Sequence, residues 1–253
     1  MSRSLSRALS IMELFTYNKK EWGISEISRE LQLPKSTVYN LVKTLEKETF
    51  LAQNRDGKYR LGIRLFELGR VYSEGNELIA VSEPIVEFLM KKYKQNIHIA
   101  IYAGRRAVFV VNKKAGTDTG HSIFTRTGYD IPAYCTAVGK VLLAWQSPEH
   151  IAYYLNTELL VSFTTWTITS KDALKEEVNN VRQQGYAVDR QEAITGLGCI
   201  AAPIFGHSGQ IIAAMSVSGE ADKVLCNDTF EECCRDVMDT ARKISQAMGF
   251  WDR

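Results

Sequence analysis

The sequence lacks the features that mark membrane and secreted proteins. No stretch of its 253 residues approaches the roughly 18 consecutive apolar residues of a membrane-spanning helix. No long apolar run follows the basic residues near the N-terminus, so no signal peptide is predicted. We therefore expect a cytoplasmic protein that has no membrane partner.

Cysteine and histidine are few and scattered. The five cysteines are odd in number and irregularly spaced, which is typical of free thiols in a reducing compartment rather than of a disulfide framework. Cys233 and Cys234 fall on the apolar face of a predicted C-terminal helix and are expected in the core. No histidine has a cysteine or carboxylate at ligand spacing, so we predict no metal site from His98, His121, His150 and His207.

Common catalytic motifs are missing as well. The sequence has no nucleophile elbow, no phosphate-binding loop and no dinucleotide fingerprint. It also shows no cluster of an acid, a base and a nucleophile. We predict no catalytic residue, no cofactor and no enzymatic activity.

The composition that remains is that of an ordinary globular protein with an uneven charge distribution. Hydrophobic residues make up 45% and charged residues 24% of the chain, and its length favours two domains over one. Residues 1–61 hold 11 Lys and Arg against 7 Asp and Glu, a net charge of +4, whereas the rest holds 20 against 22, a net charge of −2. A basic front domain suits a polyanionic partner such as DNA.

Apolar spacing predicts three helices in the first 50 residues. The first has a buried face at three- and four-residue steps, formed by Leu5, Ala8, Leu9, Met12 and Phe15. Ser25 is the predicted N-cap of a short second helix, and Pro34 opens a third over residues 35–47. Residues 50–53 and 59–61 then predict two short strands around a turn that contains Gly57. This order predicts a winged helix-turn-helix domain over residues 1–61.

The rest of the chain predicts a helical linker and a mixed domain. Apolar residues from Ile63 onward predict a linker helix within residues 62–77. Residues 78–253 predict an α+β domain that begins with a helix carrying Pro84 in its first turn. Two hairpins are expected at 97–103 with 107–112 and at 199–205 with 210–218, and helices at 137–145, 148–155, 170–184 and 228–248.

The outer face of the predicted third helix carries side chains suited to the major groove of DNA. Hydroxyl and amide groups pair with base edges, and lysines neutralise phosphates. The predicted DNA-binding residues are Ser25, Lys35, Ser36, Thr37, Tyr39, Asn40, Lys43 and Thr44, with Arg55 and Lys58 on the wing and Lys47 at the end of the helix. A plain helical bundle with a solvated polar face is the alternative, but the order of helix, short helix, Pro turn, polar helix and basic hairpin favours DNA binding.

Several segments resemble the IclR family of bacterial regulators, in the family's order and along essentially the whole chain. They are residues 24–43 (ISEISRELQLPKSTVYNLVK), 59–69 (YRLGIRLFELG), 136–144 (TAVGKVLLA), 185–192 (GYAVDRQE) and 198–205 (GCIAAPIF). Residues 138–145, 181–186 and 241–249 are most similar to the 2-keto-3-deoxygluconate repressor (KdgR) subgroup. The chain departs from that subgroup at Ala133-Tyr134 and Tyr129-Asp130, where Leu-His and a basic pair are usual, so the effector can differ.

The resemblance implies a GAF-like C-terminal domain that binds a small organic acid in a dimer or tetramer. The effector-binding residues that it implies are Ala137, Val138, Asp189, Cys199, Ser216 and Ser218. Thr136 is a natural N-cap, so free N–H groups near the following helix start would favour a ligand carboxylate. The carboxylate of Asp189 costs energy beside an anionic ligand unless it is protonated or offset by a cation.

These features predict a sequence-specific DNA-binding regulator that represses a sugar-acid or related carbon catabolic operon. Activation within the same family is one alternative, because the sign depends on where the operator lies relative to the promoter. A reading from another class is a small-molecule binding module or enzyme whose front domain mediates only protein contacts. Catalytic turnover of sugar acids would favour that reading.

Overall fold

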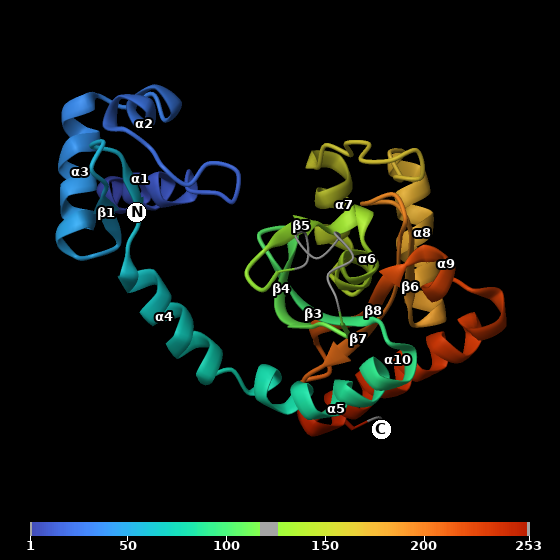
Figure 1. The fold of residues 1–253 in the computed structure, drawn as a ribbon. Coiled ribbons are helices and arrows are strands. Elements are labelled where there is room, and N and C mark those ends of the chain that lie inside the picture. Colours follow the sequence, from blue (N-terminus) through green and yellow to red (C-terminus); the bar gives the residue numbers. More distant parts are fainter. Residues whose placement is uncertain (1, 117–125, 252–253) are drawn as a thin grey trace. The chain divides into compact units, whose positions relative to one another are not determined.

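The computed structural model describes residues 2–116 and 126–251, so His121 lies outside the described residues. Two compact units divide the chain, Met1–Asn76 and Glu77–Arg253 (Figure 1). No described helix is both long and apolar enough to cross a membrane.

The N-terminal unit has the predicted order of helices and strands. Its elements are α1 (Arg3–Glu13), α2 (Ile24–Glu30), α3 (Lys35–Lys47), β1 (Leu51–Gln53), β2 (Tyr59–Leu61) and α4 (Ile63–Glu74). Strands β1 and β2 pair antiparallel, with Leu51 opposite Leu61. The main chain of Trp22 adds a bridge to Tyr59 at the edge of this ribbon. The winged helix-turn-helix that the sequence predicts is therefore confirmed.

Helix α1 buries only part of the predicted face: Met12 and Phe15 pack against the core, but Leu5 and Leu9 do not. Ile11 is fully buried, whereas Leu5 and Leu9 are 60% and 54% exposed. At 100° per residue, Ile11 lies well away from the line through Leu5 and Leu9, so the helix carries two apolar faces and only one meets the core. The prediction that Leu5 and Leu9 pack in this core was wrong.

Helix α4 falls within residues 62–77 and has no buried residue. Gly62 precedes it and donates its N–H to the carbonyl of Phe50 at 2.7 Å. A Cβ at Gly62 would lie 2.1 Å from the Thr49 carbonyl oxygen, so only glycine permits this close passage between wing and helix. Most apolar side chains of α4, including Phe66 and Val71, are exposed in the single chain.

The C-terminal unit is a mixed α/β domain around one antiparallel sheet, in the strand order β5-β4-β3-β8-β7-β6. Its strands are β3 (Asn96–Ala103), β4 (Arg106–Lys113), β5 (Asp130–Pro132), β6 (Ala187–Arg190), β7 (Leu197–Phe205) and β8 (Ile211–Glu220). Its helices are α5 (Glu77–Tyr93), η2 (Ala133–Cys135), α6 (Ala137–Ala144), α7 (Pro148–Thr157), α8 (Lys171–Gln184), α9 (Ala221–Val224) and α10 (Asn227–Ala247).

The sheet separates two apolar cores, as the alternation of side chains along a strand requires. Ile97, Ile200 and Met215 point to the face covered by α5 and α10. Ala201 and Ala214 point to the opposite face, where α6 and α8 pack. Figure 1 shows α6 lying against this second face of the curled sheet. Such a sheet with helices on both faces confirms the expected α/β effector-type fold.

Two expectations for this unit need correction. Pro84 lies inside α5 and not in its first turn, because residues 77–83 are themselves helical. Pro84 has no N–H to donate to the carbonyl four residues before it, and the hydroxyl of Ser82 donates to the neighbouring Ile79 carbonyl at 3.2 Å. Strands β5 and β6 were not predicted, because both are too short to give a clear alternating pattern.

Candidate functional site

Helix α3 presents a continuous polar surface opposite a buried one. Val38 and Val42 are fully buried and fix the inner face of the helix. The exposed residues are Lys35, Ser36, Tyr39, Asn40 and Thr44, and the half-buried ones are Thr37 and Lys43. The structure therefore brings the predicted DNA-reading side chains together on one helix face.

The turn between α2 and α3 is fixed by short-range hydrogen bonds. Gln32 adopts a left-handed conformation with a φ of 52°, and the hydroxyl of Ser28 donates to the Leu33 carbonyl at 2.6 Å. Ser25 is not the N-cap of α2 as predicted. That position belongs to Gly23, whose N–H donates to the Glu26 carboxylate at 2.7 Å, while Ser25 lies exposed in the first turn.

The wing turn is ordered by one asparagine. The side-chain oxygen of Asn54 accepts the N–H groups of Asp56 at 3.0 Å and Lys58 at 2.9 Å. Gly57 takes a φ of 76°, which suits glycine in a tight turn. This arrangement leaves Arg55 and Lys58 exposed at the tip, where the sequence placed them.

Lys43 is engaged within the domain. Its ammonium lies 2.7 Å from a carboxylate oxygen of Glu46 and 5.7 Å from the centre of the Tyr59 ring. The hydrogen bond to Glu46 is the main reason why the pKa of Lys43 is raised. Lys43 would therefore have to leave Glu46 before it could contact a phosphate. Lys35 has no described ion pair, so it could contact a phosphate without such a loss.

In the C-terminal unit, strand register places the predicted effector residues in two adjacent rows. Asp189 on β6 lies opposite Cys199 on β7, and Cys199 lies opposite Ser218 on β8. The Cys199 thiol donates to the Ser218 hydroxyl at 3.0 Å. In the next row, Ser216 lies opposite His98 on β3. Because these positions are two residues apart along their strands, all of them share one face of the sheet.

The N-terminus of α6 faces the same region. The hydroxyl of Thr136 accepts the N–H of Gly139 at 3.2 Å, which confirms the predicted N-cap. A Cβ at Gly139 would lie 2.4 Å from the Ala133 carbonyl oxygen, so glycine is needed where α6 passes η2. Ala137 and Val138 form the first turn, whose N–H groups are free of helical partners by position.

All six predicted effector residues line one small cavity. Its volume is about 20 Å³, roughly the space of one water molecule. The other lining residues were not predicted as ligand contacts: His98, Phe109, Ile131, Thr136, Ala193, Ile194 and Leu197. A polar His98 inside the apolar strand sequence IHIAI was the signal that could have identified it.

Two polar atoms in this cavity have no hydrogen-bond partner. They are Oδ2 of Asp189 and Nε2 of His98. Burial, and secondly the charge of nearby Glu192, raises the pKa of Asp189 to about 7. Burial lowers the pKa of His98 to about 4, so this ring is neutral at pH 7. Unpartnered buried groups of this kind are suited to contacts with a ligand.

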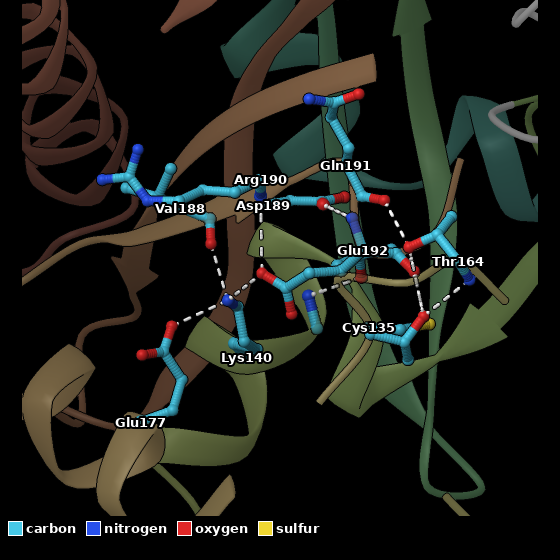
Figure 2. Close-up of polar contacts among 12 residues, drawn as sticks. Cys135, Lys140, Thr164, Glu177, Val188, Asp189, Arg190, Gln191 and Glu192 are labelled. Carbon is cyan, nitrogen blue, oxygen red and sulfur yellow. Dashed lines mark hydrogen bonds and ion pairs between the residues drawn. The ribbon is translucent and has the colours of Figure 1, made fainter. Parts of the chain in front are cut away.

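A buried lysine network lies behind the cavity (Figure 2). The Lys140 ammonium donates to Glu177 at 2.7 Å, to Glu192 at 2.7 Å and to the Val188 carbonyl at 2.6 Å. Burial acts to lower the pKa of Lys140, but the two carboxylates outweigh it and the pKa is raised. The N–H of Glu192 donates to Oδ1 of Asp189 at 2.7 Å, so the network also positions Asp189. Lys140 was not predicted as a site residue, although it is the single charged residue of α6.

The cysteines and the described histidines His98, His150 and His207 show no metal-binding arrangement. Cys233 and Cys234 are buried in the core beneath α10, as predicted. Within residues 2–116 and 126–251, no group of three or more His, Cys, Asp or Glu side chains is placed to hold a metal ion.

Comparison with known proteins matches both units. Residues 4–55 match the IclR helix-turn-helix domain, and residues 71–246 match the bacterial transcriptional regulator IclR C-terminal domain. Two regulators of Escherichia coli K12 are each 33% identical: XynR, with 88% of both chains covered, and KdgR, with 92% of this chain and 88% of that protein covered. The crystal structure of the Thermotoga maritima IclR is 27% identical, with a TM-score of 0.70 over 98% of this chain and 99% of that one. The chain therefore belongs to the IclR family of bacterial transcriptional regulators, which are DNA-binding proteins and not enzymes.

Proposed function

We propose that this regulator represses an operon for the catabolism of a sugar acid or a related carbon source, and that a small organic acid modulates its affinity for DNA. The carrying observation is that all six effector positions implied by the family motifs line one buried cavity. The similarity to KdgR supports the substrate class. Since the partner is chromosomal DNA, we place the protein in the cytoplasm.

On the DNA side, α3 enters the major groove and the wing contacts the backbone beside it. Asn40 and Tyr39, both exposed near the middle of α3, read base edges. Lys35, Arg55 and Lys58 neutralise phosphates. Further hydrogen bonds to the DNA backbone come from Ser25, Ser36, Thr37 and Thr44. Lys43 can also contact a phosphate once it has left Glu46.

On the effector side, the chemistry of the cavity favours an acid with further oxygen groups. The free N–H groups of Ala137 and Val138 at the positive end of α6 bind a carboxylate. The hydroxyls of Ser216 and Ser218 bind ligand oxygens from the opposite wall. The present cavity holds about one water, so an acid of several carbons must widen it. Binding of the acid would thus change the structure around the cavity, and a regulator that is controlled by a ligand needs such a conformational change.

A larger cleft between α7 and α8, of about 940 Å³, is a weaker candidate for the effector. It is lined mainly by solvated residues such as Lys171, Lys175 and Asn179. None of the unpartnered buried polar atoms found in the described part of the chain belongs to its lining. The smaller cavity lined by Asp189 and His98, in contrast, has two such atoms.

We also propose that the active form is a dimer or tetramer. Leu5 and Leu9 on α1 and Phe66 and Val71 on α4 are each more than half exposed in the single chain. Burial of such side chains against a second copy is favourable, and a symmetric dimer presents two recognition helices to two half-sites.

A fluorescence anisotropy titration tests the DNA-binding part of this proposal. The full chain should bind DNA from upstream of its own gene and its neighbours more tightly than random DNA of equal length, with affinity that falls steeply with salt. A reporter fused to that upstream region should be expressed more strongly when the regulator is deleted. Equal affinity for random DNA, or lower expression after deletion, would contradict specific binding or repression respectively.

A further inference from the structure

The effector cavity contains an acid and no cation. Asp189 lines it, and its Oδ2 atom has no partner. Among the lining residues that the structure describes, none is lysine or arginine. Lys140, whose charge acts on Asp189, already donates to Glu177, Glu192 and the Val188 carbonyl, and it does not line this cavity.

The groups packed around Asp189 act on its pKa in both directions: the main-chain N–H groups of Glu192 and Ala193 and the charge of Lys140 lower it, but burial and the charge of Glu192 outweigh them. Glu192, three residues after Asp189, adds a second negative charge. Its carboxylate pairs with Lys140 of α6, which also pairs with Glu177 of α8 (Figure 2). The other titratable groups that face the cavity region are His98 of β3, Cys199 of β7 and Cys135 of η2. Burial raises the pKa of both thiols, so both are neutral at pH 7, as His98 is. Among the described residues that line the cavity, none carries a positive charge at pH 7 that could offset both an ionised Asp189 and a bound carboxylate.

The two oxygens of Asp189 have different roles. Oδ1 accepts the N–H of Glu192 at 2.7 Å and is therefore fixed by the main chain. Oδ2 is free to carry a proton without breaking an existing hydrogen bond. A protonated Oδ2 becomes an O–H donor, which is what the carboxylate of a bound acid needs from this wall.

We infer that the effector acid binds as an anion together with one proton, and that Oδ2 of Asp189 takes up this proton from solvent. The statement rests on the proposed function, because it concerns the same cavity. In the balanced step, one O–H bond forms at Oδ2 as the buffer acid or hydronium ion in the solvent gives up its proton, and one negative charge enters the cavity while another is neutralised. Effector affinity is thereby linked to pH.

The sign of this linkage follows from the free protein. Burial raises the pKa of Asp189 to about 7, so below pH 7 the proton is already in place and affinity should be nearly constant. Above pH 7, each binding event must first protonate the carboxylate. Affinity should then fall about tenfold per pH unit. An acid whose own pKa lies near 3 to 4 stays ionised throughout this range and adds no slope.

Isothermal titration calorimetry of the full chain tests the proton uptake. Pyruvate, gluconate, glucuronate and 2-keto-3-deoxygluconate are screened, and the tightest binder is titrated at pH 8 in Hepes and in Tris, whose ionisation enthalpies differ. The expected result is uptake of close to one proton per cavity. Asp189→Asn should bind the same acid with no proton uptake and with no loss of affinity between pH 6.5 and pH 8.5, because its amide donates at every pH.

His98→Gln serves as the matched control, since it removes the other unpartnered group in the cavity. It can change the affinity for the acid, but it should retain the uptake of close to one proton per bound acid. Binding without proton uptake, or uptake that persists in Asp189→Asn, would overturn the inference while leaving the proposed function intact. If none of the acids binds at any pH, the proposed effector class fails and this inference fails with it.

Discussion

Substitutions of single residues on α3 can distinguish sequence-specific DNA binding from non-specific electrostatic binding. Asn40 is exposed, and a side-chain amide can bind adenine at two atoms. Asn40→Ala should reduce the affinity ratio between specific and random DNA, by a free energy of about 1–3 kcal/mol. Lys35→Ala should weaken both DNAs alike and reduce the salt slope by about 1. Anisotropy titrations at several salt concentrations measure both quantities.

Lys43→Ala is the internal control for this comparison. Its ammonium is paired with Glu46 at 2.7 Å, so its removal should change the salt slope less than the removal of Lys35. An unchanged specificity ratio in Asn40→Ala would show that α3 does not read bases through this residue.

At the residue scale, the sequence predicted exposed chemistry better than buried chemistry. The outer face of α3 follows from helical periodicity, because solvent imposes few other constraints on it. Lys140 and Glu192 were missed because the two residues that form this ion pair are 52 positions apart in the sequence. Only the folded chain brings them together, so no local sequence pattern indicates the contact. Ser25 was assigned the wrong position because Gly23 takes the N-cap with the carboxylate of Glu26 as its partner.

Among the elements, α6 depends on a close approach that glycine alone permits. A Cβ at Gly139 would lie 2.4 Å from the Ala133 carbonyl oxygen, so Gly139→Ala must displace the start of α6 or η2. We expect a loss of about 1–3 kcal/mol in the free energy of unfolding, as for other overpacked sites, and weaker acid binding. Urea unfolding followed by circular dichroism measures the first effect, and calorimetry the second.

Gly69→Ala is the matched substitution in another helix. Gly69 lies within α4, and a Cβ there would meet no atom within 4 Å. The change should leave acid binding intact and stabilise the helix by about 0.5–1 kcal/mol. A Gly139→Ala protein as stable as the unmodified chain would refute the assigned role of this glycine.

Element boundaries were predictable where caps and breakers are strong. Helix α3 runs from Lys35 to Lys47 as predicted, because Pro34 fixes its start. The same rule failed at Pro84, since a proline can also lie inside a longer helix. Helix α1 shows a further limit: periodicity marks an apolar face but does not say whether the chain itself or a second chain covers it.

For the whole molecule, the exposed faces of α1 and α4 predict self-association. Leu5→Ser with Leu9→Ser, or Val71→Ser, removes apolar side chains that are 54–70% exposed and should leave the isolated fold intact. Both changes should shift the dimer–monomer equilibrium toward the monomer, in light scattering across a range of concentrations. Leu159→Ser, at an exposed leucine of the C-terminal unit, is the control and should have no such effect. A monomeric unmodified chain would contradict the proposal.

At this scale the sequence motifs indicated the two units and the effector cavity, because each motif belongs to one short segment. The motifs did not predict that the volume of the cavity is only about 20 Å³, or that no lysine or arginine lines it. Both properties follow from the packing of β3, β6, β7 and β8 against α6. The electrostatic inference about Asp189 therefore required the structure.

The coupling of the cavity to DNA is the central claim, and one measurement tests it directly. Anisotropy of labelled upstream DNA is recorded with the full chain, with and without the acid that binds most tightly, for the unmodified protein and for Ser216→Val. Valine removes a cavity hydroxyl and fills space while suiting a strand. We predict that the acid lowers DNA affinity at least tenfold in the unmodified chain and has little effect in Ser216→Val. DNA affinity that does not respond to an acid shown to bind, or that responds equally in both proteins, would contradict the account.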